Sequence, residues 1–156
     1  MFDTLPRAKK KAIRRTVEKM LAKYRVYKFS SYEEHEAIVT ARYEQREGGR
    51  NNKIINQTAE AAIHNVDERE RRRVFVERIE RAVNELPTKE ALLIRERYMC
   101  KDYDYITDYH VYTQDFDPPI TDKTFGKIRD RAMAKLAFML GIIDERGEVI
   151  GEREAI

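Results

Sequence analysis

The sequence predicts an all-α protein, a helical bundle with a helix-turn-helix pattern in its C-terminal half. Apolar residues recur at three- and four-residue spacing along most of the chain, as on the buried face of an amphipathic helix. The 156 residues include only 6 Gly and 4 Pro, too few for the many turns of a β-rich domain. Because the apolar positions are periodic, a wholly disordered chain is excluded although 38% of the residues are charged.

Turn signals and changes in composition divide the chain into five segments. The glycines after Glu47 and the proline at position 87 mark two of the boundaries. The expected segments are a basic N-terminal helical pair (1–47), a flexible linker (48–57), a connecting helix or helices (58–86), the helix-turn-helix domain (87–141), and an acidic tail or small hairpin (142–156). We expect a break in the connecting stretch near Asp67, which with Glu70 has the spacing of a helix start. A homodimer interface is a second interpretation of this stretch.

Positive charge is concentrated at the N-terminus. Residues 1–28 carry ten Lys and Arg against two acidic residues, a balance of +8, whereas the whole chain is only +3. The apolar residues of this segment share one helical face, so the basic residues cover the rest. A basic face attracts polyanions, although a solvated face is an equal alternative. The expected contacts to phosphates or to a partner such as RNA polymerase are made by Lys10, Lys11, Arg14 and Arg15.

Three helices make up the expected helix-turn-helix pattern. The first follows Pro87, begins at Thr88 as its N-cap and runs to Met99. The second is short and ends at about Asp115, capped by Asp104 or Thr107. Prolines 118 and 119 then stop it. The third helix continues to Leu140 and is closed by a C-capping glycine at position 141.

The third helix combines an apolar face with a polar, basic one. Residues 120–140 carry five Lys and Arg against two Asp. Thr121 is the expected N-cap, and Phe125 begins the core-facing stripe. In a helix-turn-helix, the first residues of the second helix of the motif reach base edges and later basic residues reach phosphates. The residues expected to contact double-stranded DNA are Thr121, Asp122, Lys123, Thr124, Gly126, Lys127 and Arg131.

Catalysis is not expected from this sequence. The three histidines, at positions 35, 64 and 110, have no metal-ligand spacing with Cys100. Glycine-rich phosphate loops and nucleophile elbows are absent, so we expect no enzyme, metal or cofactor. Cys100 is the single cysteine and is expected to be a buried, small hydrophobic residue. A reducing compartment, the cytoplasm, is therefore expected, and no apolar run approaches the length of a membrane span.

The C-terminal half resembles region 4 of bacterial sigma factors. The residues that carry the resemblance are Leu86, Glu90, Arg97-Tyr98, Thr121, Thr124-Phe125, Ile128, Ala132 and Lys135-Leu136-Ala137. The resemblance implies a sigma-region-4-like helix-turn-helix. No segment resembles the part of a sigma factor that melts promoters, which argues against a stand-alone sigma factor.

A longer pattern is similar to the ArpU-type phage late-transcription regulators. It consists of Thr16-Val17-Glu18, Lys23-Tyr24-Arg25, Ala61-Ala62, Asn65-Val66, Arg97-Tyr98, Tyr112 and the residues of the third helix. This resemblance implies a small, sequence-specific DNA-binding activator of phage late genes, such as packaging and lysis genes, in a bacterial host cell. Two other interpretations stay open: a small terminase-like packaging subunit that binds DNA, and a helical adaptor that binds an acidic protein instead.

Overall fold

The computed structural model describes residues 2–30 and 51–150, the first six residues of the second range by their backbone only. The described residues are mainly helical, which confirms the all-α prediction, and their only β-pairing is a single bridge between Ile143 and Val149. The elements are η1 (Phe2–Thr4), α1 (Arg7–Phe29), α3 (Asn51–Asn84), α4 (Thr88–Tyr98), η2 (Tyr103–Tyr105), α5 (Asp108–His110), the π-helical turn η3 (Val111–Asp115) and α6 (Asp122–Met139).

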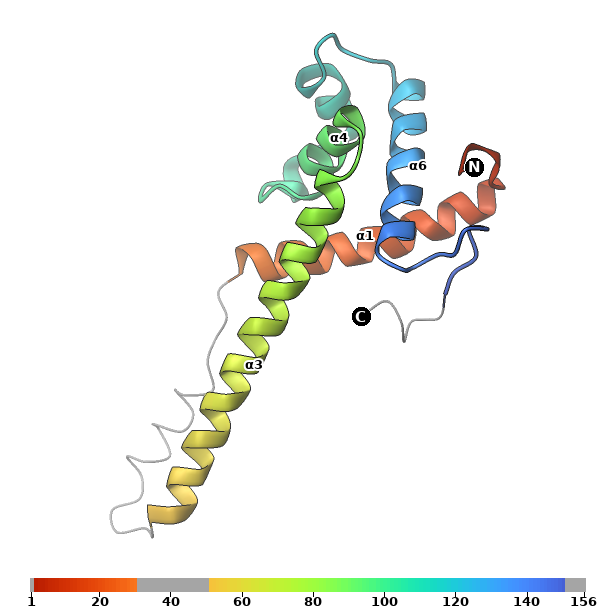
Figure 1. Ribbon diagram of the computed structural model, residues 1–156. Helices are drawn as coiled ribbons and strands as arrows, with labels where there is room; N and C mark the ends of the chain where they lie inside the picture. The colour runs from red at the N-terminus through yellow and green to blue at the C-terminus, as the bar shows by residue number, and fades with distance from the viewer. Residues whose placement is uncertain (1, 31–50, 151–156) are drawn as a thin grey trace.

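The helices form a body from which α3 projects as a long arm (Figure 1). Helix α1 crosses the C-terminal half of α3, and α6 packs against both α1 and α4. The N-terminal end of α6 therefore lies far from the free end of α3 (Figure 1).

One hydrophobic core joins these elements. Each helix contributes the apolar face that its sequence periodicity indicates, because this face is the only one it can bury without desolvating charges. The fully buried large side chains are Tyr98, Phe125, Ile13, Leu21, Ile79, Leu93, Ile94, Met133, Leu136, Leu140, Ile142 and Ile143. Helix α1 is therefore part of the same core as α6, and the basic N-terminal segment is not a separate unit.

Helix α3 differs from the expected linker and broken helix. It begins at Asn51, so residues 51–57 of the expected linker are helical, and it continues through Asp67 without a break. The stretch contains no Gly or Pro, and ion pairs one turn apart support it, such as Arg73 Nη1 to Glu77 Oε1 at 2.6 Å. The second helix of the expected N-terminal pair and residues 48–50 lie outside the described residues.

The starts of the next helices correct one prediction and confirm another. Thr88 is the first residue of α4 and not its cap, because the first helical hydrogen bond runs from the Ala91 amide to the Pro87 carbonyl at 2.9 Å. Thr107 does cap α5, where its side chain accepts a hydrogen bond from the His110 amide at 3.1 Å. The expected short helix up to Asp115 is thus an α-turn followed by a π-turn.

The end of α6 follows the sequence closely. Gly141 has a φ of +73°, which a glycine adopts without strain. The Ile142 amide then donates to the Ala137 carbonyl at 2.8 Å, closing the last turn. Of the two alternatives for the C-terminal segment, residues 142–150 form the small hairpin, in which the Ile150 amide donates to the Ile142 carbonyl at 2.7 Å. Residues 151–156 lie outside the described part.

A buried ion pair fastens α4 to α6. Glu90 is only 7% exposed, and both of its carboxylate oxygens accept hydrogen bonds from Lys135 Nζ, at 2.9 and 3.0 Å. A buried carboxylate that loses its cation keeps its desolvation cost without compensation.

We therefore expect Lys135→Met to lower the free energy of unfolding by about 2 kcal/mol. The double variant Glu90→Leu with Lys135→Met removes both charges, and we expect it to recover most of the loss. Urea denaturation followed by circular dichroism measures both variants. A single variant as stable as the unchanged protein would contradict the role assigned to this pair.

Candidate nucleic-acid interface

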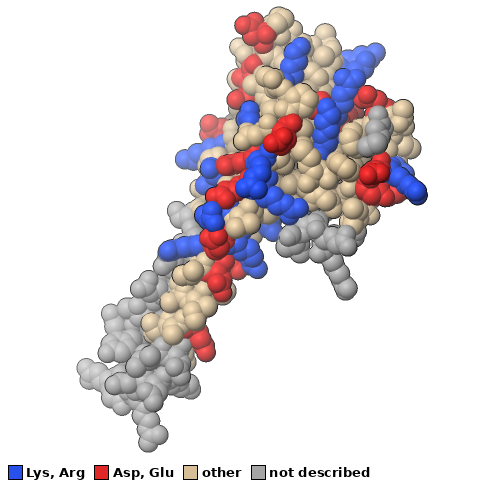
Figure 2. Space-filling view, in the orientation of Figure 1, with Lys and Arg blue, Asp and Glu red and all other residues tan. Residues whose placement is uncertain are grey.

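The residues expected to contact DNA lie together on the first turns of α6. Thr121, Asp122, Lys123, Thr124 and Lys127 are exposed, and Gly126 is half-buried. Figure 2 shows Lys and Arg side chains over the upper end of α6, the end at which the helix begins. The opposite face of the same turns is anchored in the core, where Phe125 is 1% exposed. The sequence prediction of one buried and one presented face therefore agrees with these positions.

The basic residues of this face differ in whether they are already paired. Arg131 Nε donates to Asp3 Oδ1 at 2.9 Å, and this hydrogen bond holds the pKa of Asp3 below its usual value. In the described part of the chain, neither Lys123 nor Lys127 makes an ion pair or a side-chain hydrogen bond. The two lysines are thus the cations of α6 that are free to meet an anion, whereas Arg131 joins α6 to η1.

Thr121 fixes the start of α6. Its hydroxyl oxygen accepts a hydrogen bond from the Thr124 amide at 3.2 Å and donates to Thr124 Oγ1 at 2.9 Å. The expected N-cap is therefore confirmed. The cap orients the first turn, and the other amides of this turn point outward at the positive end of the helix dipole.

Among the described residues, no neighbouring group requires a glycine at position 126. A Cβ atom added at this position would meet nothing within 4 Å. Because glycine lowers helix stability relative to alanine by about 1 kcal/mol, the residue weakens α6 without a compensating contact in the described chain. The space beside the backbone at this position is therefore open.

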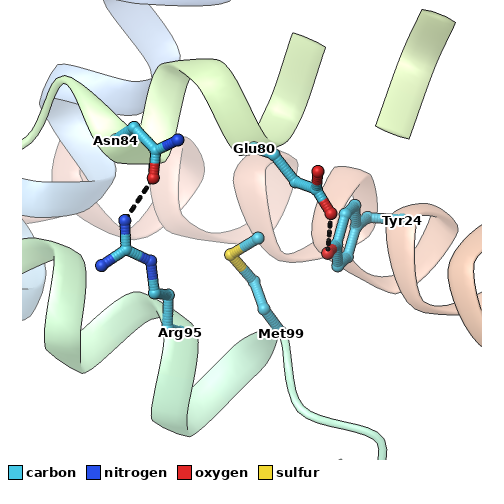
Figure 3. Close-up of a pocket in the computed structure, with 5 residues that line it drawn as sticks. All are labelled: Tyr24, Glu80, Asn84, Arg95 and Met99. Atoms are coloured by element: carbon cyan, nitrogen blue, oxygen red, sulfur yellow. Dashed lines mark hydrogen bonds between the residues drawn. The ribbon is translucent and has the colours of Figure 1, made fainter. Parts of the chain in front are cut away.

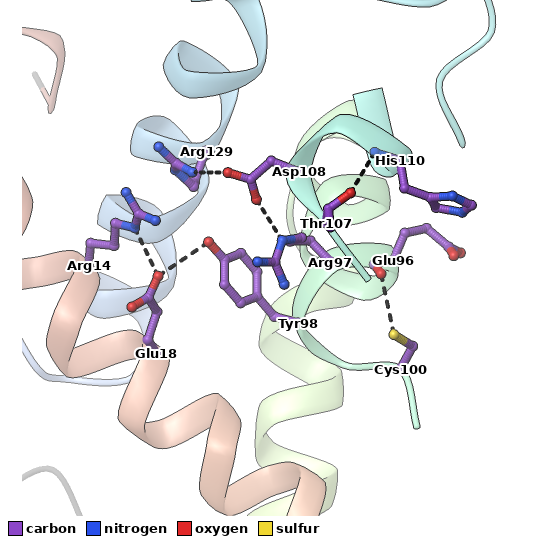
Figure 4. Close-up of polar contacts among 10 residues, drawn as sticks. All are labelled: Arg14, Glu18, Glu96, Arg97, Tyr98, Cys100, Thr107, Asp108, His110 and Arg129. Atoms are coloured by element: carbon purple, nitrogen blue, oxygen red, sulfur yellow. Dashed lines mark hydrogen bonds and ion pairs between the residues drawn. The ribbon is translucent and has the colours of Figure 1, made fainter. Parts of the chain in front are cut away.

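A carboxylate positions the three helical pieces that present this face. Asp108, at the start of α5, accepts hydrogen bonds from Arg97 Nε of α4 at 2.6 Å and from Arg129 Nη1 of α6 at 3.1 Å (Figure 4). Both arginine side chains are largely buried, at 18% and 15% exposure. Burial lowers the pKa of Arg97, but the hydrogen bond and charge of Asp108 outweigh this effect and raise it. The connection is also held by the ring of Tyr112, which packs on Phe125 with the ring centres 5.6 Å apart.

Sequence reasoning missed this cluster, although one signal was present. Arg129 follows Phe125 by one helical turn, so a cation lies on the core face of α6. A charge in that position requires a buried partner. The sequence alone does not say that the partner is Asp108, because the two residues are separated by the whole connection between α5 and α6.

The four basic residues predicted in α1 have different roles. Arg14 Nε donates to Glu18 at 2.8 Å, and Glu18 also accepts from the Tyr98 hydroxyl at 3.3 Å (Figure 4). Lys10 lies 3.4 Å from the carbonyl oxygen of Asp3. Lys11 and Arg15 are exposed and have no ion pair in the described residues. Arg14 therefore belongs to the internal network, and only Lys11 and Arg15 stand free.

Sites for a small ligand or metal are poorly supported. A cavity of about 320 Å³ lies between α1, α3 and α4, but its polar lining is paired internally. Tyr24 donates to Glu80 at 2.9 Å, and Arg95 donates to Asn84 (Figure 3). Within residues 2–30 and 51–150, no three His, Cys, Asp or Glu side chains gather as metal ligands.

Cys100 is half-buried instead of buried, and its Sγ lies 3.4 Å from the Glu96 carbonyl oxygen. No helix in the described part is long and apolar enough to span a membrane.

We expect Thr121→Ala to destabilise the protein by about 1 kcal/mol, because the amide at the start of α6 loses its cap. Thr121→Ser keeps the hydroxyl and is the matched control, with little loss. Thermal unfolding of the three proteins tests the assignment. Equal losses for alanine and serine would show that the methyl group, and not the cap, is what matters.

Comparison of the chain with known protein families, with curated proteins and with solved structures found no match. The resemblance to ArpU-type regulators and to sigma-factor region 4 accordingly stays a prediction from the sequence.

Proposed function

We propose that the protein binds double-stranded DNA in a sequence-specific manner through the first turns of α6. The observation that carries the proposal is the pair of unpaired, exposed lysines, Lys123 and Lys127, on a helix whose other face is locked into the core. An α-helix fits the major groove, where lysine binds guanine O6 and N7 or a phosphate, and threonine contacts the methyl group of thymine. Thr124, exposed between the lysines, supplies that second chemistry.

The arrangement around α6 supports a helix-turn-helix role for residues 87–141. Residues 108–115 form the short preceding helical piece, residues 116–121 the connection, and α6 the helix that enters the groove. The open space at Gly126 allows close approach of the duplex to the backbone. Rigid anchoring reduces the conformational entropy lost on binding, so more of the contact energy appears as affinity.

The free face of α1 supports a second contact to an anionic surface. Lys11, Arg15 and Lys19 follow one another at four-residue spacing, are exposed, and lie opposite the buried Ile13. In the proposed function this stripe engages DNA phosphates or RNA polymerase, and the protein activates phage late genes. The same stripe favours the second candidate, an adaptor that binds an acidic protein without DNA. A terminase-like packaging subunit would use the α6 surface without such recruitment.

The first test is DNA-binding affinity across a salt series, with duplexes from the source genome and an unrelated duplex. We expect a preferred duplex and a steep fall in affinity with salt. Lys123→Ala and Lys127→Ala should each weaken binding by about 5- to 150-fold where the lysine reads a base, which corresponds to about 1–3 kcal/mol. A phosphate contact would instead lower the salt slope by about 1.

Lys101→Ala is the matched control for these variants. Lys101 is exposed but lies in the turn after α4, and its removal changes net charge by the same amount. Equal effects of all three variants would show that charge alone matters. Absence of binding at low salt would contradict the proposal and favour the adaptor, whereas salt-dependent binding without preference would favour the packaging subunit.

Asp108→Asn tests whether this half-buried carboxylate positions α6. The change removes a negative charge, so simple electrostatics predicts tighter DNA binding. We expect weaker binding instead, together with a stability loss of about 2 kcal/mol, because the two buried guanidinium groups lose their shared anion. Asp104→Asn, at an exposed acidic residue of η2, is the control and should not weaken binding. Tighter binding by the Asp108 variant would contradict the positioning role.

A further inference from the structure

The projecting part of α3 carries an apolar stripe that remains exposed. Ile63 and Val66 are 61% and 63% exposed, and Val74 is 49% exposed. Ile63 and Val74 are eleven residues apart, which is close to three helical turns and puts them on one face. Single exposed apolar residues are ordinary on protein surfaces, but a stripe at helical spacing is typical of a helix–helix interface.

The stripe leads to a cavity between α3 and α1. Its volume is about 530 Å³, and its apolar lining consists of Val74, Phe75 and Tyr27. The rings of Tyr27 and Phe75 meet edge to face, with centres 5.5 Å apart. Five charged side chains also line it, those of Lys23, Asp67, Glu70, Arg71 and Arg78. An aliphatic side chain of a partner can therefore pack against the apolar part of the cavity, provided that the charges of the partner are opposite to those around it.

The two halves of α3 differ in net charge, although arginines 71–73 also pair with glutamates of the same helix. Residues 57–70 carry four acidic residues and one Arg, a balance of −3, whereas residues 71–81 carry five Arg and two Glu, a balance of +3. An identical helix that runs in the opposite direction brings each acidic half against a basic half. A parallel partner would instead oppose like charges, which is unfavourable.

We propose that two copies of this chain associate through antiparallel α3 helices, centred near residue 69. In this register Ile63 of each copy faces Phe75 and the cavity of the other, and Asp67 faces Arg71. The interface is isologous, so the apolar stripe of each copy packs into the cavity of the other. Helix α6 begins at the far end of the body from the free end of α3 (Figure 1), so the paired arms leave the proposed DNA-binding face uncovered.

The first test measures the molar mass of the full chain, without DNA, by sedimentation equilibrium over a micromolar concentration range. We expect a reversible dimer. Ile63→Glu should raise the dissociation constant about tenfold or more, because a charge would enter the apolar cavity. Val149→Glu is the matched control: Val149 is 52% exposed on the C-terminal hairpin, and its substitution should leave the dimer unchanged.

A charge exchange tests the register. Asp67→Arg and Arg71→Asp should each weaken the dimer, and the double variant should restore it, since it re-forms the opposite-charge pair between the copies. A monomer at every concentration, or an Ile63→Glu variant that dimerises like the unchanged chain, would overturn the proposal. Failure of the double variant to recover would overturn the antiparallel register. Because DNA is absent, these outcomes are independent of the proposed DNA binding.

Discussion

A single carboxylate, that of Asp108, holds together the three helical pieces that present the candidate DNA-binding face. It lies between two largely buried guanidinium groups, on α4 and on α6, and at the start of α5. Arg97 Nη1 and Arg129 Nε are buried without a hydrogen-bond partner in the described part of the chain. These groups already carry part of their desolvation cost uncompensated, so the anion between them offsets much of the cost of packing α4 against α6 at this point.

Some basic residues of the protein pair with carboxylates inside the molecule, whereas others face the solvent. Arg131 and Lys135 each meet a carboxylate of another element and thereby connect α6 with η1 and α4, whereas Arg14 pairs with Glu18 within α1. Lys123 and Lys127 have no such partner in the described residues. Composition alone does not separate these two groups, because an arginine on a helix looks the same whether it faces a neighbour or the solvent. The separation appears only when the helices are packed.

The sequence was informative where structure depends on local interactions. Apolar periodicity identified the core faces, the threonine at position 121 marked a helix start, and Gly141 marked a helix end, because caps depend on neighbouring residues only. Prediction failed at Thr88 by one residue, since proline can serve as a cap without a side-chain acceptor. It also failed at Asp67, where capping spacing competes with a long run that contains no helix-breaking residue. Asp108 was not found because its two partners come from distant parts of the chain.

The charges of α3 stabilise the helix through ion pairs one turn apart, and they also leave a net charge of opposite sign on its two halves. Ion pairs within a helix need opposite charges one turn apart, and alternating signs provide them without any net field. Arginines 71–73 make such pairs with Glu68, Glu70 and Glu77 of the same helix. A net charge of −3 over residues 57–70 and of +3 over residues 71–81 nevertheless remains, and a partner with the opposite order of charges complements it. The proposed antiparallel copy would be such a partner, and it would cover Ile63 and Val66 at the same time.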